Sequence, residues 1–315
     1  MHLVSVLMPA FNADRFITEA IDSIIKQSYP NWELLVCDDG STDSTWEKMN
    51  AIRDSRIRLF RNSSNQGKAK TVNELFKAAS GSIITVHDAD DVSLPQRFSR
   101  VIEFLEAHPE LTMCGHSIQR MTLGGRLLPL YRLKASDHEE IMNEMLQDNT
   151  SGDASLFVRR AVLDDLGEVY RPYFKNNMDY DLALRVIEKY RVANIPEVLL
   201  LYRNVPDSIS KRVITYHKLV TQEVTKALAL ERRQKGTDAL QRGDWAEIKR
   251  LEEAHSQPFL ADKTLHLRKM ASFFMYCKMN REAIRYMTIA IKEEPLRFEN
   301  WRTLQYCIRK TLLGR

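Results

Sequence analysis

Two short apolar segments of the sequence each end in a cluster of acidic side chains. These acids are Asp38 and Asp39 after the first segment, and Asp88, Asp90 and Asp91 after the second. Carboxylates this close together repel each other unless a cation offsets their charge. Mg²⁺ and Mn²⁺ prefer oxygen ligands, and they often take only one or two from protein while phosphates and water complete the shell. The pattern Asp88-x-Asp90 therefore predicts a divalent cation that bridges to a diphosphate.

Lys68 is a further candidate for contact with the diphosphate, because the sequence contains no glycine-rich phosphate loop. A lysine that merely faces solvent on a helix is the alternative for this residue. Helix capping is the alternative for the acids. Capping accounts for Asp43 or Ser44, which precede a helical segment, but it does not explain three acids at the end of one strand.

The surrounding pattern predicts the elements that bring the two acidic clusters together. Strand-like runs at 3–9, 33–39, 57–60 and 82–88 alternate with helical patterns at 15–27, 41–54, 68–79 and 94–108. This alternation predicts an α/β fold with a Rossmann-like, mostly parallel sheet and helices on both faces. Ligands of such sheets gather at the carboxyl ends of the strands, so acids some 50 residues apart in sequence should meet there.

The second half of the sequence changes character. Residues 111–210 mix strand and helix patterns, with a hairpin at Gly124-Gly125, helices near 137–147 and 179–190, and strands near 154–160 and 192–202. We expect them to complete one domain, residues 1–211. Residues 212–315 are helical in pattern throughout and form the second region. Within it, Ala271, Ala283, Ala290 and Pro295 have the spacing of a tetratricopeptide repeat near 264–315, although an unrelated helical hairpin fits nearly as well.

Charge and composition restrict the cellular setting and the partners. The chain of 315 residues has a net charge of +4, but residues 211–315 hold 22 Lys and Arg against 12 Asp and Glu. This basic region suggests an anionic partner, either membrane headgroups or an acidic acceptor, and a solvated helical surface is the alternative. We expect no nucleic-acid partner.

The sequence shows no signal peptide and no run of about 18 apolar residues. We therefore expect a cytoplasmic protein, and peripheral association with the inner face of the plasma membrane through the basic region stays open. Four scattered cysteines indicate buried free thiols.

Five motifs together resemble one enzyme family. "VSVLMPAFN", "LLVCDDGSTDST", "NQGKAKTVN", "ITVHDADDVSLPQRF" and "NNMDYDLALRV" occur in the order and spacing of the GT-A family 2 glycosyltransferases, over residues 3 to about 210. The resemblance implies a GT-A fold and transfer of a sugar from a nucleotide-sugar, most often a UDP-sugar, with inversion at the anomeric carbon. It also implies Mn²⁺ or Mg²⁺ as cofactor and a saccharide or lipid-linked acceptor.

The resemblance also implies a role for individual residues. The donor-binding positions that it implies are Pro9, Ala10, Asn12, Asp39, Lys68, Asp88 and Ala89. Among them Asp39 would accept the base N–H of uracil, and Asp88 would lie near the ribose and the metal. Asp90 matches the metal ligand. Many members carry a histidine that helps to hold the metal or diphosphate where this chain has Val205, so a third protein ligand is not predicted.

Asp179 matches the catalytic base of the family. Its position at the start of a helical pattern would also favour a carboxylate, because the helix dipole is positive there. Asp181 is the rival, but residues i and i+2 of a helix point to different sides. We expect Asp181 to support the helix start or a neighbouring loop. Segments 121–135 and 204–213 are candidates for a lid that excludes water.

Two other functions remain open on the sequence alone. "DADDV" also resembles the nucleophile motif of haloacid dehalogenase-type phosphohydrolases, which carry it on their first strand, whereas here it follows the fourth. The other alternative is a non-catalytic nucleotide-sugar-binding or interaction protein. The chain lacks the Gln-x-x-Arg-Trp motif and membrane helices that processive synthases share, so we expect a non-processive enzyme.

Overall fold

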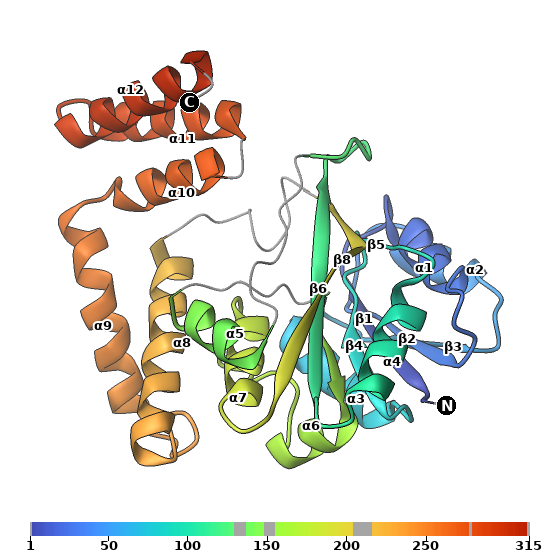
Figure 1. Ribbon diagram of the computed structural model, residues 1–315. Coiled ribbons are helices and arrows are strands. Elements are labelled where there is room, and N and C mark those ends of the chain that lie inside the picture. Colours follow the sequence, from blue (N-terminus) through green and yellow to red (C-terminus); the bar gives the residue numbers. More distant parts are fainter. Residues whose placement is uncertain (1, 129–136, 148–154, 204–215, 277–278, 314–315) are drawn as a thin grey trace. The chain divides into compact units, whose positions relative to one another are not determined.

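The computed structural model describes residues 2–128, 137–147, 155–203, 216–276, 279–313 (Figure 1). The chain divides into two compact units, Met1–Val205 and Pro206–Arg315. The boundary predicted between residues 211 and 212 lies outside the described residues, as do residues 129–135 of the first predicted lid segment and all of the second, 204–213.

The first unit is built on one eight-stranded sheet with the strand order β3-β2-β1-β4-β7-β6-β8-β5. Its strands are β1 (Val4–Ala10), β2 (Trp32–Asp38), β3 (Ile57–Arg61), β4 (Ile83–Val86), β5 (Val92–Ser93), β6 (Met113–Met121), β7 (Phe157–Arg159) and β8 (Val192–Arg203). Its helices are α1 (Ile17–Ile25), α2 (Thr45–Ala51), α3 (Lys68–Ala78), α4 (Arg97–Ala107), α5 (His138–Gln147), α6 (Arg160–Leu166) and α7 (Met178–Ile187).

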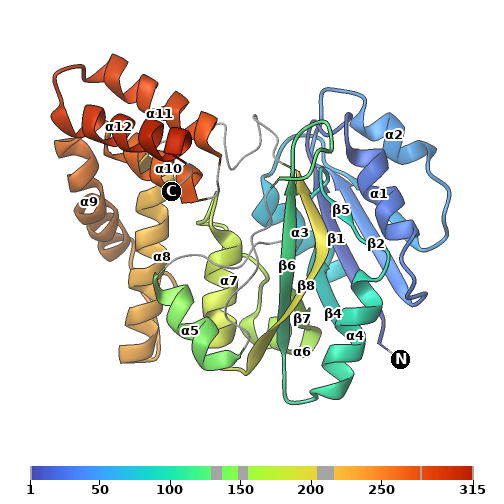
Figure 2. The ribbon, with the colours of Figure 1, turned by 45° about the horizontal axis from the view of Figure 1, so that its top comes forward.

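The first four strands form the parallel half that the sequence predicts. β1 pairs in parallel with β2 and with β4, and β2 pairs in parallel with β3. Helices α1, α2 and α4 cover one face of this sheet, while α3, α6 and α7 lie on the other (Figure 2). The apolar positions of α1 and α4 recur with helical spacing and are buried against alternate residues of β1. The predicted α/β architecture is therefore confirmed.

The other half of the sheet is mixed, so "mostly parallel" applies best to the first half. β7 pairs antiparallel with β4 and β6, and the two-residue strand β5 pairs antiparallel with β8. The sequence does not predict β5, because two residues after an acidic turn carry no periodic signal. β8 runs parallel to β6, with register shifts at Ser117. Pro196 lies in β8 opposite this irregularity, as expected for a residue that cannot donate to the ladder.

The second unit is helical throughout its described residues, as predicted. Its helices are α8 (Tyr216–Lys235), α9 (Trp245–Ala261), α10 (Leu265–Tyr276), α11 (Asn280–Glu293) and α12 (Phe298–Leu313). Ala271, Ala283 and Ala290 are fully buried in a cluster shared by α10, α11 and α12. Small residues at these positions allow close helix contact, but the tetratricopeptide interpretation stays a prediction. No helix within the described residues is both long and apolar enough to span a bilayer.

Candidate active site

The acidic clusters follow strands that end at the same edge of the sheet. Asp38 is the last residue of β2 and pairs in register with Ala10, the last residue of β1. Asp88 comes two residues after the end of β4, which pairs with β1 on its other side. The parallel order β2-β1-β4 thus places the two clusters at the carboxyl ends of the strands on either side of β1, where open α/β sheets bind ligands.

Asp88, Asp90 and Asp91 form a tight carboxylate group. One oxygen from each lies within 4.8 Å of one from every other. Burial, and next the charge of Asp88, raise the pKa of Asp90 to about 6. Burial and the charges of Asp90 and Asp88 also raise the pKa of Asp91 well above its usual value. The Oδ2 atom of Asp91 is buried and has no hydrogen-bond partner. Protonation of one carboxyl group or a bound cation is needed to offset the repulsion among these three carboxylates.

Arg203, at the end of β8, holds this acidic loop in place. Its backbone N–H donates to Asp91 Oδ1 at 2.8 Å, and its Nε donates to the carbonyl of Asp90 at 2.9 Å. Its two terminal nitrogens donate to the carbonyl of Leu123 and to Glu19 Oε2. The sequence does not predict Arg203 as a residue of the site. No local signal could have done so, because its partner Asp90 is 113 residues away in the chain.

Lys68 is directed to the same cluster. It is the first residue of α3, and its Nζ lies 2.5 Å from Asp88 Oδ1. Both side chains are largely buried. The alternative of a solvent-facing lysine is therefore wrong. The Lys68 cation here offsets part of the negative charge of the acidic loop.

Asp39 is buried and organises the loop between β3 and α3. Its Oδ1 accepts hydrogen bonds from Asn62 Nδ2 at 2.7 Å and from the backbone N–H of Gln66 at 2.9 Å. Its Oδ2 accepts from the backbone N–H of Gly67 at 2.9 Å. A carboxylate offers about four lone-pair sites. One acceptor site, on Oδ2, is therefore left over after these three bonds.

Gly40 permits the close approach of this loop. Its φ is +75°, and a Cβ atom there would lie 2.6 Å from the backbone carbon of Ser64. A side chain would therefore collide with main-chain atoms and not with a flexible group. The motif "DDG" thus combines the carboxylate that binds the loop with the residue that makes room for it.

The residues predicted on the first strand border the same edge. The carbonyl of Ala10 accepts from the N–H of Asp39 at 2.8 Å. Asn12 has a positive φ of 48°, which asparagine tolerates better than most residues. Its Oδ1 accepts from the N–H of Thr42 at 2.9 Å, and its own N–H donates to Ser41 Oγ. Asn12 therefore joins the loop after β1 to the loop after β2, while Pro9 is the penultimate residue of β1.

The two acids at the start of α7 have different environments. Asp181 is fully buried and its carboxylate pairs with Arg171 and with Arg185, whose Nε lies 3.0 Å from Oδ2. Asp179 is only partly buried, in the first turn of the helix. Asn177, the residue before the helix, has a positive φ of 58°. The structure thus gives Asp181 the structural role expected for it.

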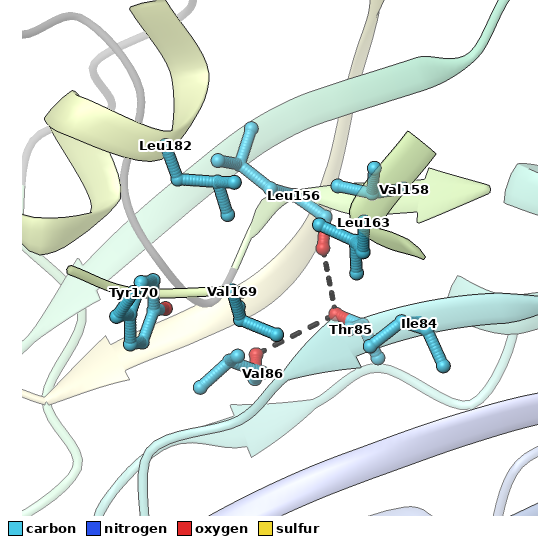
Figure 3. Close-up of a pocket in the computed structure, with 9 residues that line it drawn as sticks. All are labelled: Ile84, Thr85, Val86, Leu156, Val158, Leu163, Val169, Tyr170 and Leu182. Atoms are coloured by element: carbon cyan, nitrogen blue, oxygen red, sulfur yellow. Dashed lines mark hydrogen bonds between the residues drawn. The ribbon is translucent and has the colours of Figure 1, made fainter. Parts of the chain in front are cut away.

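Packing brings the helix of Asp179 to the strand of the acidic loop. Leu182, one turn after Asp179, lines a small apolar pocket together with Ile84 and Val86 of β4 (Figure 3). Val86 precedes Asp88 by two residues. Tyr170 lines the same pocket, and both its backbone groups bond to Asn73 of α3. The pocket is therefore part of the packing that positions the site, and Asn73 is a second contributing residue that the sequence does not predict.

A buried polar cluster supports the acidic loop from beneath. Arg97 is fully buried and donates to His116 Nε2 at 2.9 Å and to Ser93 Oγ at 2.9 Å. His87 Nε2 lies 3.0 Å from the same Ser93 Oγ. Burial lowers the pKa of His87 to about 3, so this imidazole is neutral at physiological pH. The two histidines are structural, and neither belongs to the group of potential metal ligands found in the described residues.

Comparison with known proteins identifies the family. The family model described as "Glycosyl transferase family 2" matches residues 5–167. The chain belongs to glycosyltransferase family 2. This glycosyltransferase is 32% identical over 223 residues to the putative glycosyltransferase EpsE of Bacillus subtilis, a match that covers 68% of the chain and 77% of that relative. The membership excludes the phosphohydrolase interpretation.

One curated relative and two solved structures extend the comparison. The glycosyltransferase is 42% identical over 104 residues to WfgD of Escherichia coli, named as a UDP-Glc:alpha-D-GlcNAc-diphosphoundecaprenol beta-1,3-glucosyltransferase. That match covers 33% of this chain and 41% of WfgD. S. aureus TarS 1-349 in complex with UDP-GlcNAc has a TM-score of 0.63 at 16% identity, and the match covers 99% of this chain and 92% of that one.

The second solved structure is the mannosyltransferase PcManGT from Pyrobaculum calidifontis, in complex with GDP-Man and Mn²⁺. It has a TM-score of 0.52 at 16% identity, covering 93% of this chain and 88% of that one. At this identity both solved structures are similar to the glycosyltransferase in fold. The GT-A fold implied by the motifs is confirmed.

Proposed function

We propose that this glycosyltransferase transfers one sugar per encounter from a UDP-sugar to a saccharide or lipid-linked acceptor, with inversion at the anomeric carbon. The observation that carries the proposal is the group of Asp88, Asp90 and Asp91 at the carboxyl ends of the parallel strands, next to Lys68. TarS and PcManGT, which share the fold, were solved with nucleotide-sugars. The proposal extends that donor class to this chain.

The free acceptor site on Asp39 supports a role in donor recognition. Three of its lone-pair sites are occupied by the loop at 62–67, which fixes the carboxylate in one orientation. The remaining site on Oδ2 suits the imide N–H of uracil, which donates a single hydrogen bond. Pro9, Ala10 and Asn12 border the same edge and would lie beside the base. Lys68 and Asp88, with Ala89, would lie beside the ribose and diphosphate.

The carboxylate group fits a hard divalent cation. Three carboxylates within 4.8 Å of one another, one with a buried oxygen that lacks a partner, form an oxygen-only donor set. Asp90 would hold Mn²⁺ or Mg²⁺, with Asp88 and Asp91 beside it. When bound, the ion would offset the negative charge that develops on the leaving diphosphate. Arg203 fixes the backbone of Asp90, so the protein positions this carboxylate in advance.

Asp179 is the proposed general base. Asp179 is only partly buried, whereas Asp181 is fully buried between two guanidinium groups. Asp179 would remove the proton of the acceptor hydroxyl as the oxygen attacks the anomeric carbon. The new carbon–oxygen bond would form on the face opposite the breaking bond to the diphosphate, so one displacement inverts the configuration.

The second unit is proposed to serve acceptor or membrane association. Its basic charge suits an anionic partner, and one relative, WfgD, is named for a diphosphoundecaprenol-linked acceptor. A lipid-linked acceptor would require the enzyme to work at a membrane surface.

Donor screening tests the proposal directly. The purified protein would be incubated with UDP-, GDP- and dTDP-sugars in the presence of Mn²⁺, and its unfolding temperature would be measured. A UDP-sugar at about 100 times its Kd should stabilise the protein by about 2.7 kcal/mol. Failure of every UDP-sugar to shift the transition, with a clear shift for another nucleotide, would refute the assignment of the donor. Binding without any transfer or donor hydrolysis would favour the non-catalytic alternative.

A further inference from the structure

The last helix of the second unit carries an exposed apolar surface. Residues of α12 that pack inward are Asn300 and Cys307, both fully buried. A different face of the helix bears apolar side chains at helical spacing, here named the α12 ridge. The residues of the α12 ridge are Phe298, Trp301, Ile308 and Leu312. Exposed fractions of 71% for Phe298, 50% for Trp301 and 78% for Leu312 show that α10 and α11 leave this face uncovered.

Cationic side chains flank the α12 ridge. Arg302 and Arg309 each follow a ridge residue by one position, which places them along one side of the ridge. Both are exposed, and no acidic side chain among the described residues forms an ion pair with them. The helix contains three cationic side chains, with Lys310 as the third, against one acid, Glu299. The rim of the ridge is therefore positively charged.

We infer that the α12 ridge is a docking surface for an anionic lipid bilayer. An amphipathic helix with Trp, Phe and Leu on one face and Arg or Lys beside them lies in the interface of such membranes. Trp301 suits this position further, because its Nε1 donates to the carbonyl of Pro295 at 2.8 Å and leaves the ring otherwise apolar. This surface would bring the enzyme to a lipid-linked acceptor. In naming that role for the surface, the inference rests on the proposed function.

Charge argues against a second copy of the chain as the occupant. A two-fold contact of the ridge with itself would bring the same surface of both copies together. Arg302 and Arg309 of one copy would then lie close to those of the other, without acidic partners. A bilayer that contains anionic lipids instead supplies the opposite charge to the rim and apolar chains to the ridge.

Vesicle co-sedimentation of the full chain tests the inference. We expect binding to vesicles that contain phosphatidylglycerol, weaker binding to phosphatidylcholine vesicles, and loss of binding at high salt. The triple variant Phe298→Ser, Trp301→Ser, Leu312→Ser should reduce partition by at least about tenfold. The matched control is Leu260→Ser on α9, whose side chain is also exposed, at 56%. It should bind as the unmodified chain does.

A second variant keeps the test decisive if the triple variant does not fold. Arg302→Gln with Arg309→Gln leaves the apolar ridge intact, and it should weaken binding to anionic vesicles by about tenfold or more, with little effect on phosphatidylcholine. Unchanged vesicle binding of both variants would overturn the inference. So would a dimer in light scattering that the triple variant dissociates, without vesicle binding. UDP-sugar binding measured without vesicles reports on the proposed function separately.

Discussion

Replacing Asp181 by asparagine should unfold the first unit more easily without removing the catalytic base. The carboxylate accepts from Arg171 Nε at 2.9 Å and from Arg185 Nε at 3.0 Å, and all three side chains are buried. Asparagine keeps the shape but removes the charge, so two buried guanidinium groups lose their counter-ion. Breaking a buried pair from one side costs about 3–5 kcal/mol. Because asparagine retains one acceptor oxygen, we expect a loss of about 3 kcal/mol.

Urea unfolding followed by tryptophan emission measures this loss, since Trp32 and Trp46 lie in the first unit. With an m-value of about 1–3 kcal/mol/M, the midpoint of Asp181→Asn should fall by about 1 M or more. Asp179→Asn is the matched control two residues away. Its loss of stability should be smaller, because Asp179 is only partly buried whereas Asp181 is fully buried.

The same two variants separate stability from chemistry. Asp179→Asn should bind UDP-sugar normally and transfer the sugar at least about 10²-fold more slowly, because a positioned base contributes about 10²–10⁴-fold. Asp181→Asn, assayed where it is folded, should transfer the sugar. An Asp181→Asn midpoint equal to that of the unmodified chain would refute the structural role. A folded, inactive Asp181→Asn beside an active Asp179→Asn would show that the base has been misassigned.

Three further predictions concern donor binding and the acidic loop. Asp90→Asn should sharply reduce transfer and make UDP affinity insensitive to Mn²⁺ in calorimetry; full activity in excess chelator would contradict this. Asp39→Ala should weaken donor binding by about 1.5–3 kcal/mol, because a charged acceptor is lost, and normal affinity with lost turnover would argue against the assignment. Arg203→Lys should keep a cation but lose the planar donors to the carbonyls of Asp90 and Leu123. It should weaken the Mn²⁺ dependence of UDP binding, and an unchanged Mn²⁺ titration would show that the loop does not need Arg203.

The sequence by itself predicted the elements and the edge of the sheet where ligands bind. Alternating apolar runs and helical patterns identified β1 to β4 and their helices, because burial on both faces of a parallel sheet imposes a local periodicity. The motif at Asp88, Asp90 and Asp91 was visible because its members are close in sequence. The family resemblance added roles for Asp39 and Asp179 that no local pattern carries.

Only the tertiary structure decided how these residues are held. The contacts of Arg203 with the acidic loop, of Asn73 with Tyr170, and of Asp39 with the loop at 62–67 join segments that are distant in the chain. Such contacts depend on strand order and register, which local periodicity does not encode. The different roles of Asp179 and Asp181 likewise depend on packing, because Asp181 is fully buried beside Arg171 and Arg185. The physical reason is that a side chain's environment is set by the elements packed around it.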